Sequence, residues 1–379
     1  MANTLTALAP VLYSAAQVVS QEPVGALGAI SMDFDDKGVA IGDTINVPLA
    51  PVRALADYSP SMNLNGGNLG DDAIAAKVPV TISANKSVSW HLTGEQIRSL
   101  DNGAESAEWL RQMMLQGMRA LRNQAEADLC AAIKVGASRA VGTAGTTPFA
   151  SDINLIPALY KVLKDNGAPM ADLQLIIDSS AGLNLRKLGI IQQAYQAGSE
   201  EERRSGDLLR QFGFAIKESA GIATHTKGTC ASYVTSGSTA KGVTDVALVT
   251  GTGTVLAGDV VTFAADSNNA YVVNTGVAAP GTISLGRPGA RVTIATANAL
   301  TVGNSYTPNL AFERSAVVGV MRPPLIPANA NIEQLMVSDD RGLTYLLCKV
   351  VGDGVVTFRL HLAWGFKVVQ SEHAAVLMG

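Results

Sequence analysis

The chain of 379 residues has little charge, few aromatic side chains, three cysteines and four histidines. Its 32 acidic residues outnumber its 28 basic residues, so it lacks the basic surplus expected of a dedicated nucleic-acid-binding protein. No run of apolar residues is long enough to span a bilayer. The N-terminal residues lack the Lys- or Arg-rich start of a secretory signal peptide, which argues against a cell-surface adhesin.

The cysteines and histidines predict neither a disulfide framework nor a metal site. Cys130, Cys230 and Cys348 are far apart and odd in number, which is typical of reduced, packed thiols in a cytosolic product. No metal-ligand spacing connects the four histidines, which are His91, His225, His361 and His373. We therefore expect no metal and no cofactor.

The most prominent feature that is present is a helical pattern over residues 103–136. Steps of three and four place one apolar stripe on this helix: Leu110, Met114, Met118, Leu121, Ala125, Leu129 and Ile133. The opposite face is predicted to be polar and to carry Arg111, Gln112, Arg119, Arg122, Asn123 and Glu126. At about 1.5 Å per residue the helix would be a rod of roughly 45 Å. Gly117 interrupts it and marks either close packing or a bend.

The segments before this helix predict an arm, a strand and a long hairpin. Residues 4–24 are mildly amphipathic and indicate a short N-terminal helix or arm. Residues 41–49 alternate as a strand, with Pro48 favouring a sheet edge. Residues 50–76 have the polar, glycine-rich composition of a loop, and residues 77–92 alternate again over a length of about 50 Å. Because this exceeds ordinary strand length, we expect the hairpin to reach onto a neighbouring subunit.

The segments flanking the long helix predict a mixed α/β lobe. Thr93 and Gln96 form a capping-box pattern for a short helix at residues 96–100, and Ser179 begins another helix. The remaining expected elements are a helix at 152–166, strands at 174–178 and 212–216, and an exposed loop at 198–206.

From about residue 224 to residue 307 the composition changes to Thr, Val, Gly and Ala with almost no charge. Short strand patterns recur there between glycine turns, which predicts a separately folded all-β module of sandwich or barrel type. Residues 309–379 return to ordinary composition. They contain a strand at 334–338 and an antiparallel hairpin around Gly352-Asp353-Gly354.

No group of residues predicts catalysis. Asp178-Ser179-Ser180 sits at a strand-to-helix junction, but it lacks the frame of a nucleophile elbow and an N-cap explains it. Gly251-Thr252-Gly253 lacks a P-loop lysine and is expected to be a turn. The charged run at residues 200–204 is expected to be a solvated loop.

In the order of its elements the chain resembles the major capsid proteins of tailed phages, which have the Hong Kong 97-like fold. The nearest likeness is the P-twenty-two type of coat protein, which carries an inserted β-rich domain. The likeness rests on the hairpin at residues 50–85, the rod helix at 104–135 and the passage at 173–216 that contains Arg204-Ser205-Gly206 and Phe212-Gly213-Phe214. It also rests on Thr226-Lys227-Gly228-Thr229 with residues 256–263, and on Ala363-Trp364-Gly365-Phe366 followed by residues 372–377.

The resemblance implies an α+β fold with an N-terminal arm, an extended hairpin, a spine helix, peripheral and axial domains, and an all-β insertion. The implied domains are residues 1–30 for the arm, 31–92 for strand and hairpin, 93–150 for the peripheral domain with the spine helix, 151–223 for the first axial part, 224–308 for the insertion, and 309–379 for the return to the axial and peripheral domains.

The resemblance also implies the function. The chain would be a coat subunit, not an enzyme, that forms hexamers and pentamers of an icosahedral shell around double-stranded DNA, with scaffolding and portal proteins as partners and the virion as its location. Some members of the fold cross-link through a hairpin Lys, but only Lys77 and Lys86 lie nearby, and we expect no cross-link. The hairpin residues expected to contact a neighbouring subunit are Tyr58, Ser59, Pro60, Met62, Asn63, Leu64, Asn65, Leu69, Asp71 and Asp72. The alternative is an enzyme that carries a β-sandwich ligand-binding module.

Overall fold

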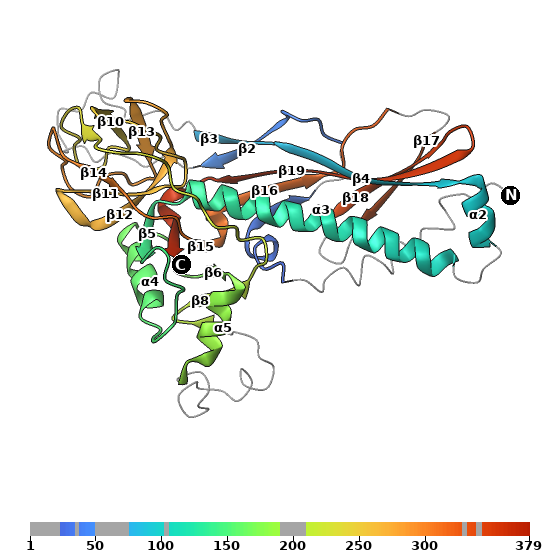
Figure 1. Cartoon of the computed structure of the whole chain (residues 1–379), viewed down its shortest axis with the longest axis horizontal. Helices are drawn as coiled ribbons and strands as arrows, with labels where there is room; N and C mark the ends of the chain where they lie inside the picture. The colour runs from blue at the N-terminus through green and yellow to red at the C-terminus, as the bar shows by residue number, and fades with distance from the viewer. Residues whose placement is uncertain are drawn as a thin grey trace, which may run out of the picture.

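The computed structural model describes residues 23–34, 38–49, 76–101, 106–189, 210–327, 332–338 and 343–379. Within them the chain is an α+β protein in which strands predominate, as expected from the sequence. Figure 1 shows an elongated body in which one long helix and several long strands run along the main axis, with a β-rich lobe and a helical lobe at one end. The expected N-terminal helix at residues 4–24 lies almost wholly outside the described residues.

The longest element is helix α3, Ser106–Gly136, which confirms the expected rod; residues 103–105 lie outside the described residues. Its apolar stripe is buried from Met114 to Ile133, as the periodicity predicts. Leu110 and Arg111 fall outside the residues whose side chains are described. A Cβ atom on Gly117 would lie 3.5 Å from Trp90 and 3.6 Å from Leu360, so this glycine marks close packing of the helix on two strands.

The polar face of α3 is narrower than the sequence predicts. Gln112 and Arg119 are exposed, and Asn123 is half-buried. Arg122 and Glu126, however, are each only 1% exposed, and the prediction that they face solvent is wrong. Arg122 and Glu126 continue the steps of four from Met118 and so belong to the buried side of the helix.

Helix α3 lies along a six-stranded sheet (Figure 1). The strand order is β1 (Ser31–Phe34), β16 (Val317–Arg322), β19 (Val355–Val368), β18 (Thr344–Val351) and β17 (Ile332–Ser338), with β4 (Ala84–Thr93) also paired to β19. β1 is parallel to β16, and the other pairs are antiparallel. The expected hairpin around Gly352-Asp353-Gly354 is confirmed as the β18–β19 turn, in which Gly354 has φ 72°.

The expected single strand at residues 77–92 is two strands that belong to two sheets. β3 (Ala76–Thr81) pairs with β2 (Thr44–Leu49) in a two-stranded sheet, and β4 joins the six-stranded sheet. The alternation is correct, because Val80, Ile82, Trp90 and Leu92 are all buried. Val80 and Ile82 are covered within the chain itself, because they pack in a small cluster with residues of β16 and β19. The expected reach of the hairpin onto a neighbouring subunit stays a prediction.

The capping box before the long helix is confirmed. Thr93 N donates to Gln96 Oε1 at 3.0 Å, and Gln96 N donates back to Thr93 Oγ1 at 3.4 Å. The helix that it starts, α2 (Gly94–Asp101), is longer than the expected residues 96–100.

A second, twelve-stranded sheet forms the two lobes, which lie at the C-terminal end of α3. Its strand order is β7-β8-β6-β15-β20-β5-β12-β13-β10-β9, with β11 paired to β12 and β14. Helices α4 (Leu155–Asp165) and α5 (Ser179–Lys187) accompany the strands of the helical lobe: β5 (Arg139–Gly142), β6 (Leu173–Ile177), β7 (Arg210–Gln211), β8 (Phe214–Glu218), β15 (Pro308–Glu313) and β20 (Ala374–Met378).

Three expected elements of this lobe are present, but their first and last residues differ from those expected. The helix expected at 152–166 is α4, and the strand expected at 174–178 is β6. The strand expected at 212–216 is β8, which begins only at Phe214. Phe212 and Gly213, with φ values of 47° and 86°, form instead the two-residue turn that joins β7 to β8.

The β-rich lobe contains β9 (Val234–Thr235), β10 (Asp245–Val249), β11 (Val260–Phe263), β12 (Asp266–Thr275), β13 (Thr282–Leu285) and β14 (Leu300–Val302). It has a hydrophobic cluster of its own, centred on Tyr233, Phe263 and Tyr271. It is nevertheless continuous with the rest of the sheet, because β12 pairs with β5 at Ala270 to Ala140 and Tyr271 to Arg139. The expectation of a separately folded insertion therefore stays a prediction.

Candidate functional site

The hairpin residues that the sequence singles out, from Tyr58 to Asp72, lie outside the described residues. The base of the hairpin is described: Leu49 of β2 pairs with Ala76 of β3, so residues 50–75 connect the open end of this two-stranded sheet. Pro48 lies opposite Lys77 there. A proline in a two-stranded sheet interrupts only one ladder, which agrees with its predicted edge position.

The motifs considered for catalysis have structural roles. Asp178 is the N-cap of α5, and its carboxylate accepts hydrogen bonds from Ser180 N at 3.1 Å and Ala181 N at 3.0 Å. Gly251 and Gly253, with φ values of 132° and 84°, flank Thr252, which forms an isolated antiparallel bridge with Ala231 in place of the expected turn. In the described ranges no three His, Cys, Asp or Glu side chains gather as metal ligands. The same ranges contain no helix that is long and apolar enough to cross a membrane.

The structure instead brings buried polar groups together on the second half of α3. Glu126, which the sequence places on the exposed face, points to residues 23–30, the segment that leads into β1. Its Oε1 accepts Ala26 N at 2.8 Å and the Ser219 hydroxyl at 2.6 Å, and its Oε2 accepts Leu27 N at 2.9 Å. The carboxylate thus caps the 3-10 turn η2, Leu27–Ala29, whose N-cap Ala26 has no side-chain acceptor.

The other side of this segment is held by residues at the end of β8 and directly after it. Ala220 N donates to Pro23 O at 3.1 Å, and Lys217 Nζ donates to Gly28 O at 3.0 Å. A Cβ atom on Gly25 would lie 2.5 Å from Glu218 O, so only glycine permits this approach. Residues 23–30 are therefore clamped between α3 and the end of β8, and we name this arrangement the clamp.

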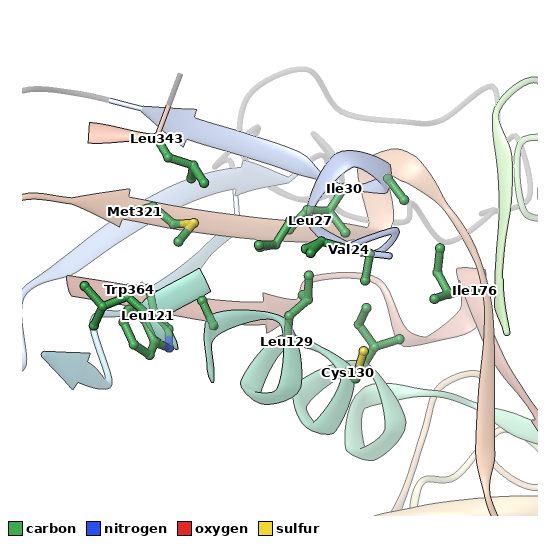
Figure 2. Close-up of a cluster of buried hydrophobic side chains, with 14 of the residues drawn as sticks. Val24, Leu27, Ile30, Leu121, Leu129, Cys130, Ile176, Met321, Leu343 and Trp364 are labelled. Carbon is green, nitrogen blue, oxygen red and sulfur yellow. The ribbon is translucent and has the colours of Figure 1, made fainter. Parts of the chain in front are cut away.

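Apolar contacts complete the clamp. Figure 2 shows Val24, Leu27 and Ile30 lying over the α3 side that carries Leu129 and Cys130, and all three are buried. Burial, together with the Glu126 carboxylate, raises the pKa of the Cys130 thiol to about 12. Cys130 therefore stays protonated and behaves as a packing residue, as the sequence predicts for the cysteines.

A second buried polar group joins the last turn of α3 to the β-rich lobe. Lys134 Nζ lies 3.3 Å from His225 Nδ1, and His225 Nε2 lies 2.8 Å from Asp259 Oδ1. Because an ammonium only donates, Nδ1 accepts and Nε2–H donates to the carboxylate. Asp259 also accepts Gly228 N and Leu256 N, at 3.1 Å and 2.7 Å. Burial lowers the pKa of Lys134.

His225 lies at the neck of this lobe. Its backbone forms both hydrogen bonds of an antiparallel bridge with Tyr306, at 2.8 Å and 3.1 Å. The two rings are 5.4 Å apart, and the Tyr306 hydroxyl donates to Gly258 O at 2.6 Å. Burial, with a smaller contribution from Asp259, raises the pKa of Tyr306. The chain thus enters and leaves the lobe at one hydrogen-bonded point beside the end of α3.

A third group fastens the same lobe to α4. Arg139 of β5 donates to Asn269 Oδ1 of β12 at 3.0 Å, to Asn166 Oδ1 at 2.8 Å and to Val162 O at 3.1 Å. Burial lowers the pKa of this guanidinium, and the nearby Arg291 acts in the same direction. The first two groups connect the C-terminal half of α3 to the N-terminal segment and to the β-rich lobe. The third, in β5 just after α3, connects the β-rich lobe to the helical lobe.

Sequence reasoning missed these groups, although one signal was present. Met118, Arg122, Glu126, Leu129 and Ile133 follow one another at steps of four, four, three and four, which is the spacing of a buried stripe. No local pattern indicates that Ser219 or the backbone of residue 26 meets Glu126, because these partners are about a hundred residues away.

No protein-family model matches the chain, and no curated protein matches its sequence. Solved structures are similar to it over nearly the whole length. A structure titled Mycobacterium phage Che8 is 13% identical with a TM-score of 0.47 and covers 95% of this chain and 89% of its own. The capsid of cyanophage P-SCSP1u is 14% identical with a TM-score of 0.48 and covers 92% of this chain and 86% of its own.

A virus-like particle from Pyrococcus furiosus is 10% identical with a TM-score of 0.44, and the match covers 98% of both chains. At these sequence identities and TM-scores, what is known of those structures applies to those proteins and is not transferred to this chain. The function has to be argued from the residues and architecture of this chain.

Proposed function

We propose that the chain is the major capsid protein of a tailed bacteriophage, a subunit that assembles with copies of itself into an icosahedral shell around double-stranded DNA. The observation that carries the proposal is the extended architecture in Figure 1. A 31-residue helix lies along a long sheet, and a β-rich lobe and a helical lobe lie together at one end of this body, which are the kinds of element that the sequence resemblance implies.

This architecture suits a shell subunit for a physical reason. The described residues form four separate hydrophobic clusters instead of one central core. A body built in this way has large faces relative to its volume, and copies packed side by side would cover them. Stable protein interfaces bury roughly 1,600 Å² in total, which an elongated subunit can supply to several neighbours.

Exposed apolar side chains in the segment before β2 and in the segment after β16 support the same proposal. Ile41 is 64% exposed and Leu325 is 74% exposed. Their segments are adjacent, because Leu325 N donates to Val39 O at 3.0 Å. Side chains of this kind gain free energy when a neighbouring copy covers them.

The finer assignment follows the resemblance. The shell would contain hexamers and pentamers, would form on a scaffolding protein with a portal, and would expand as DNA enters. Residues 224–308 would be the inserted domain, and the hairpin residues Tyr58 to Asp72 would contact a neighbouring subunit. The role is structural, without catalysis or a cofactor.

Shortening the hairpin tests this proposal. Replacing residues 59–73 by a short Gly-Ser turn removes the hairpin tip but keeps the described β2–β3 pairing. We expect the shortened monomer to unfold at an unchanged temperature and to form few or no shells in electron micrographs. Normal shells from the shortened chain would contradict the contact role of the hairpin. A discrete small oligomer from the full-length chain would favour the enzyme alternative.

A further inference from the structure

A buried guanidinium on α3 has no partner. Arg122 is 1% exposed, and in the part of the chain that the structure describes its Nε, Nη1 and Nη2 atoms make no hydrogen bond. Arginine keeps its charge in proteins, so it cannot escape this environment by losing a proton. An unpaired buried charge is among the most unfavourable features that a fold can contain. A second arrangement in which Arg122 finds an acceptor would therefore be strongly favoured electrostatically.

The nearest suitable acceptor in the sequence is already occupied. Glu126 is one helical turn after Arg122, and residues four apart on a helix have Cβ atoms about 5–6 Å apart, close enough to pair. In the structure, however, the Glu126 carboxylate accepts Ala26 N, Leu27 N and the Ser219 hydroxyl. In the docked state the Glu126 carboxylate is therefore turned to the N-terminal segment and Ser219, and it makes no hydrogen bond with Arg122.

We propose that Arg122 and residues 23–30 compete for Glu126, so that the clamp is a two-state switch. In the docked state Glu126 holds the segment and Arg122 is unpaired. In the released state the segment leaves, and Arg122 pairs with Glu126 along α3. Each state satisfies what the other leaves unsatisfied, so the free-energy difference between them is smaller than the number of buried contacts in the clamp would indicate.

Release changes the reach of the N-terminal residues. In the docked state the chain is held from Pro23, whereas after release the first fixed element is β1 at Ser31. Eight freed residues can extend over roughly 25 Å. That reach matters for contacts between copies only if the proposed function is correct, whereas the switch itself is a property of the single chain.

Hydrogen exchange of the Ala26 and Leu27 amides in the unassembled full-length chain tests the switch, because these amides are protected only while the segment is docked. Arg122→Met removes the competitor and should slow their exchange about tenfold relative to the amides of α3. Ser219→Ala removes a donor that holds the Glu126 carboxylate in its docked position and should accelerate it about tenfold. These changes correspond to ~1.4 kcal/mol each. Arg119→Met, an exposed position on the same helix, is the control and should change neither rate.

The outcomes separate a switch from a purely structural arginine. If Arg122→Met left the Ala26 and Leu27 rates unchanged relative to α3, or raised exchange throughout the helix, Arg122 would not compete for Glu126. Ser219→Ala provides an independent check if Arg122→Met fails to fold. Equal exchange in Ser219→Ala and the wild-type chain would contradict the proposal on its own.

Discussion

Among single residues, Phe212 combines two unfavourable features. Its φ of 47° lies in the left-handed region, and its large apolar side chain is 53% exposed, so packing does not offset the backbone strain. Asparagine tolerates this conformation. We therefore expect Phe212→Asn to raise the free energy of unfolding of the unassembled chain by about 1 kcal/mol. Urea denaturation measures the change.

Phe214 provides the matched control for this prediction. It is two residues further on, in β8, and is fully buried. Phe214→Asn should lower stability by several kcal/mol, since it removes a buried aromatic ring and introduces a buried amide. Loss of stability in both variants would show that the turn does not strain Phe212.

His361 on β19 makes stability depend on pH. Burial, and secondly the charge of Arg359, lower its pKa below the ordinary value of 6.5. The unfolded chain therefore binds a proton at a higher pH than the folded chain does. The stability associated with neutral His361 is fully present above pH 6.5 and is lost as the pH falls below this value towards the lowered pKa.

His361→Gln should remove this part of the pH dependence. Denaturation of the wild-type chain and the variant between pH 7.5 and about 5 compares the two slopes directly. We expect the wild-type chain to lose stability more steeply on acidification. An equal slope in both proteins would mean that His361 protonates at the same pH in the folded and unfolded states.

At the scale of elements, Gly117 in the middle of α3 is a position where a substitution should raise the stability of the chain. A glycine in a helix interior costs up to about 1 kcal/mol relative to alanine. A Cβ atom at this position would meet Trp90, Leu360 and Val88 at 3.5–3.7 Å, which is ordinary van der Waals contact. Gly117→Ala should therefore raise the free energy of unfolding by roughly 0.5–1 kcal/mol.

Gly136, at the end of the same helix, is the contrasting position. A Cβ atom there would lie within 2.5 Å of Val368 side-chain atoms, so Gly136→Ala should destabilise the chain. Thermal unfolding of the two variants measures both signs together. A loss of stability in Gly117→Ala would mean that α3 packs more tightly on β4 and β19 than these distances indicate.

The elements that the sequence predicts well are those whose pattern is local. The periodicity of α3, the glycine turn of the β18–β19 hairpin and the Thr93–Gln96 capping box each depend on residues close together in the chain. The division of residues 77–92 between two sheets is not local. Alternation continues unbroken through Ile82 and Ser83, and only the pairing partners, β2 for one strand and β19 for the other, separate them.

For the candidate site the limit is the same. The position of Glu126 on the buried stripe could be predicted from the helical period, but its partners could not, since Ala26 and Ser219 approach it only in the folded chain. Similarly, the change in composition near residue 224 indicates a β module, whereas its pairing with β5 is visible only in three dimensions.

For the whole molecule, the central claim is that this elongated chain is a shell subunit. It rests on the elongated architecture and on the exposed side chains of Ile41 and Leu325, which we propose that further copies of the chain cover. The claim therefore concerns what the chain does at high concentration rather than any chemistry at one site.

Sedimentation of the purified full-length chain, with electron microscopy of the fractions, tests this claim most directly. The account predicts fast-sedimenting, closed particles of uniform diameter, assembled either from the chain alone or after a scaffolding protein is added. A chain that remains a monomer or a small discrete oligomer under both conditions, or that forms open fibres, would contradict it.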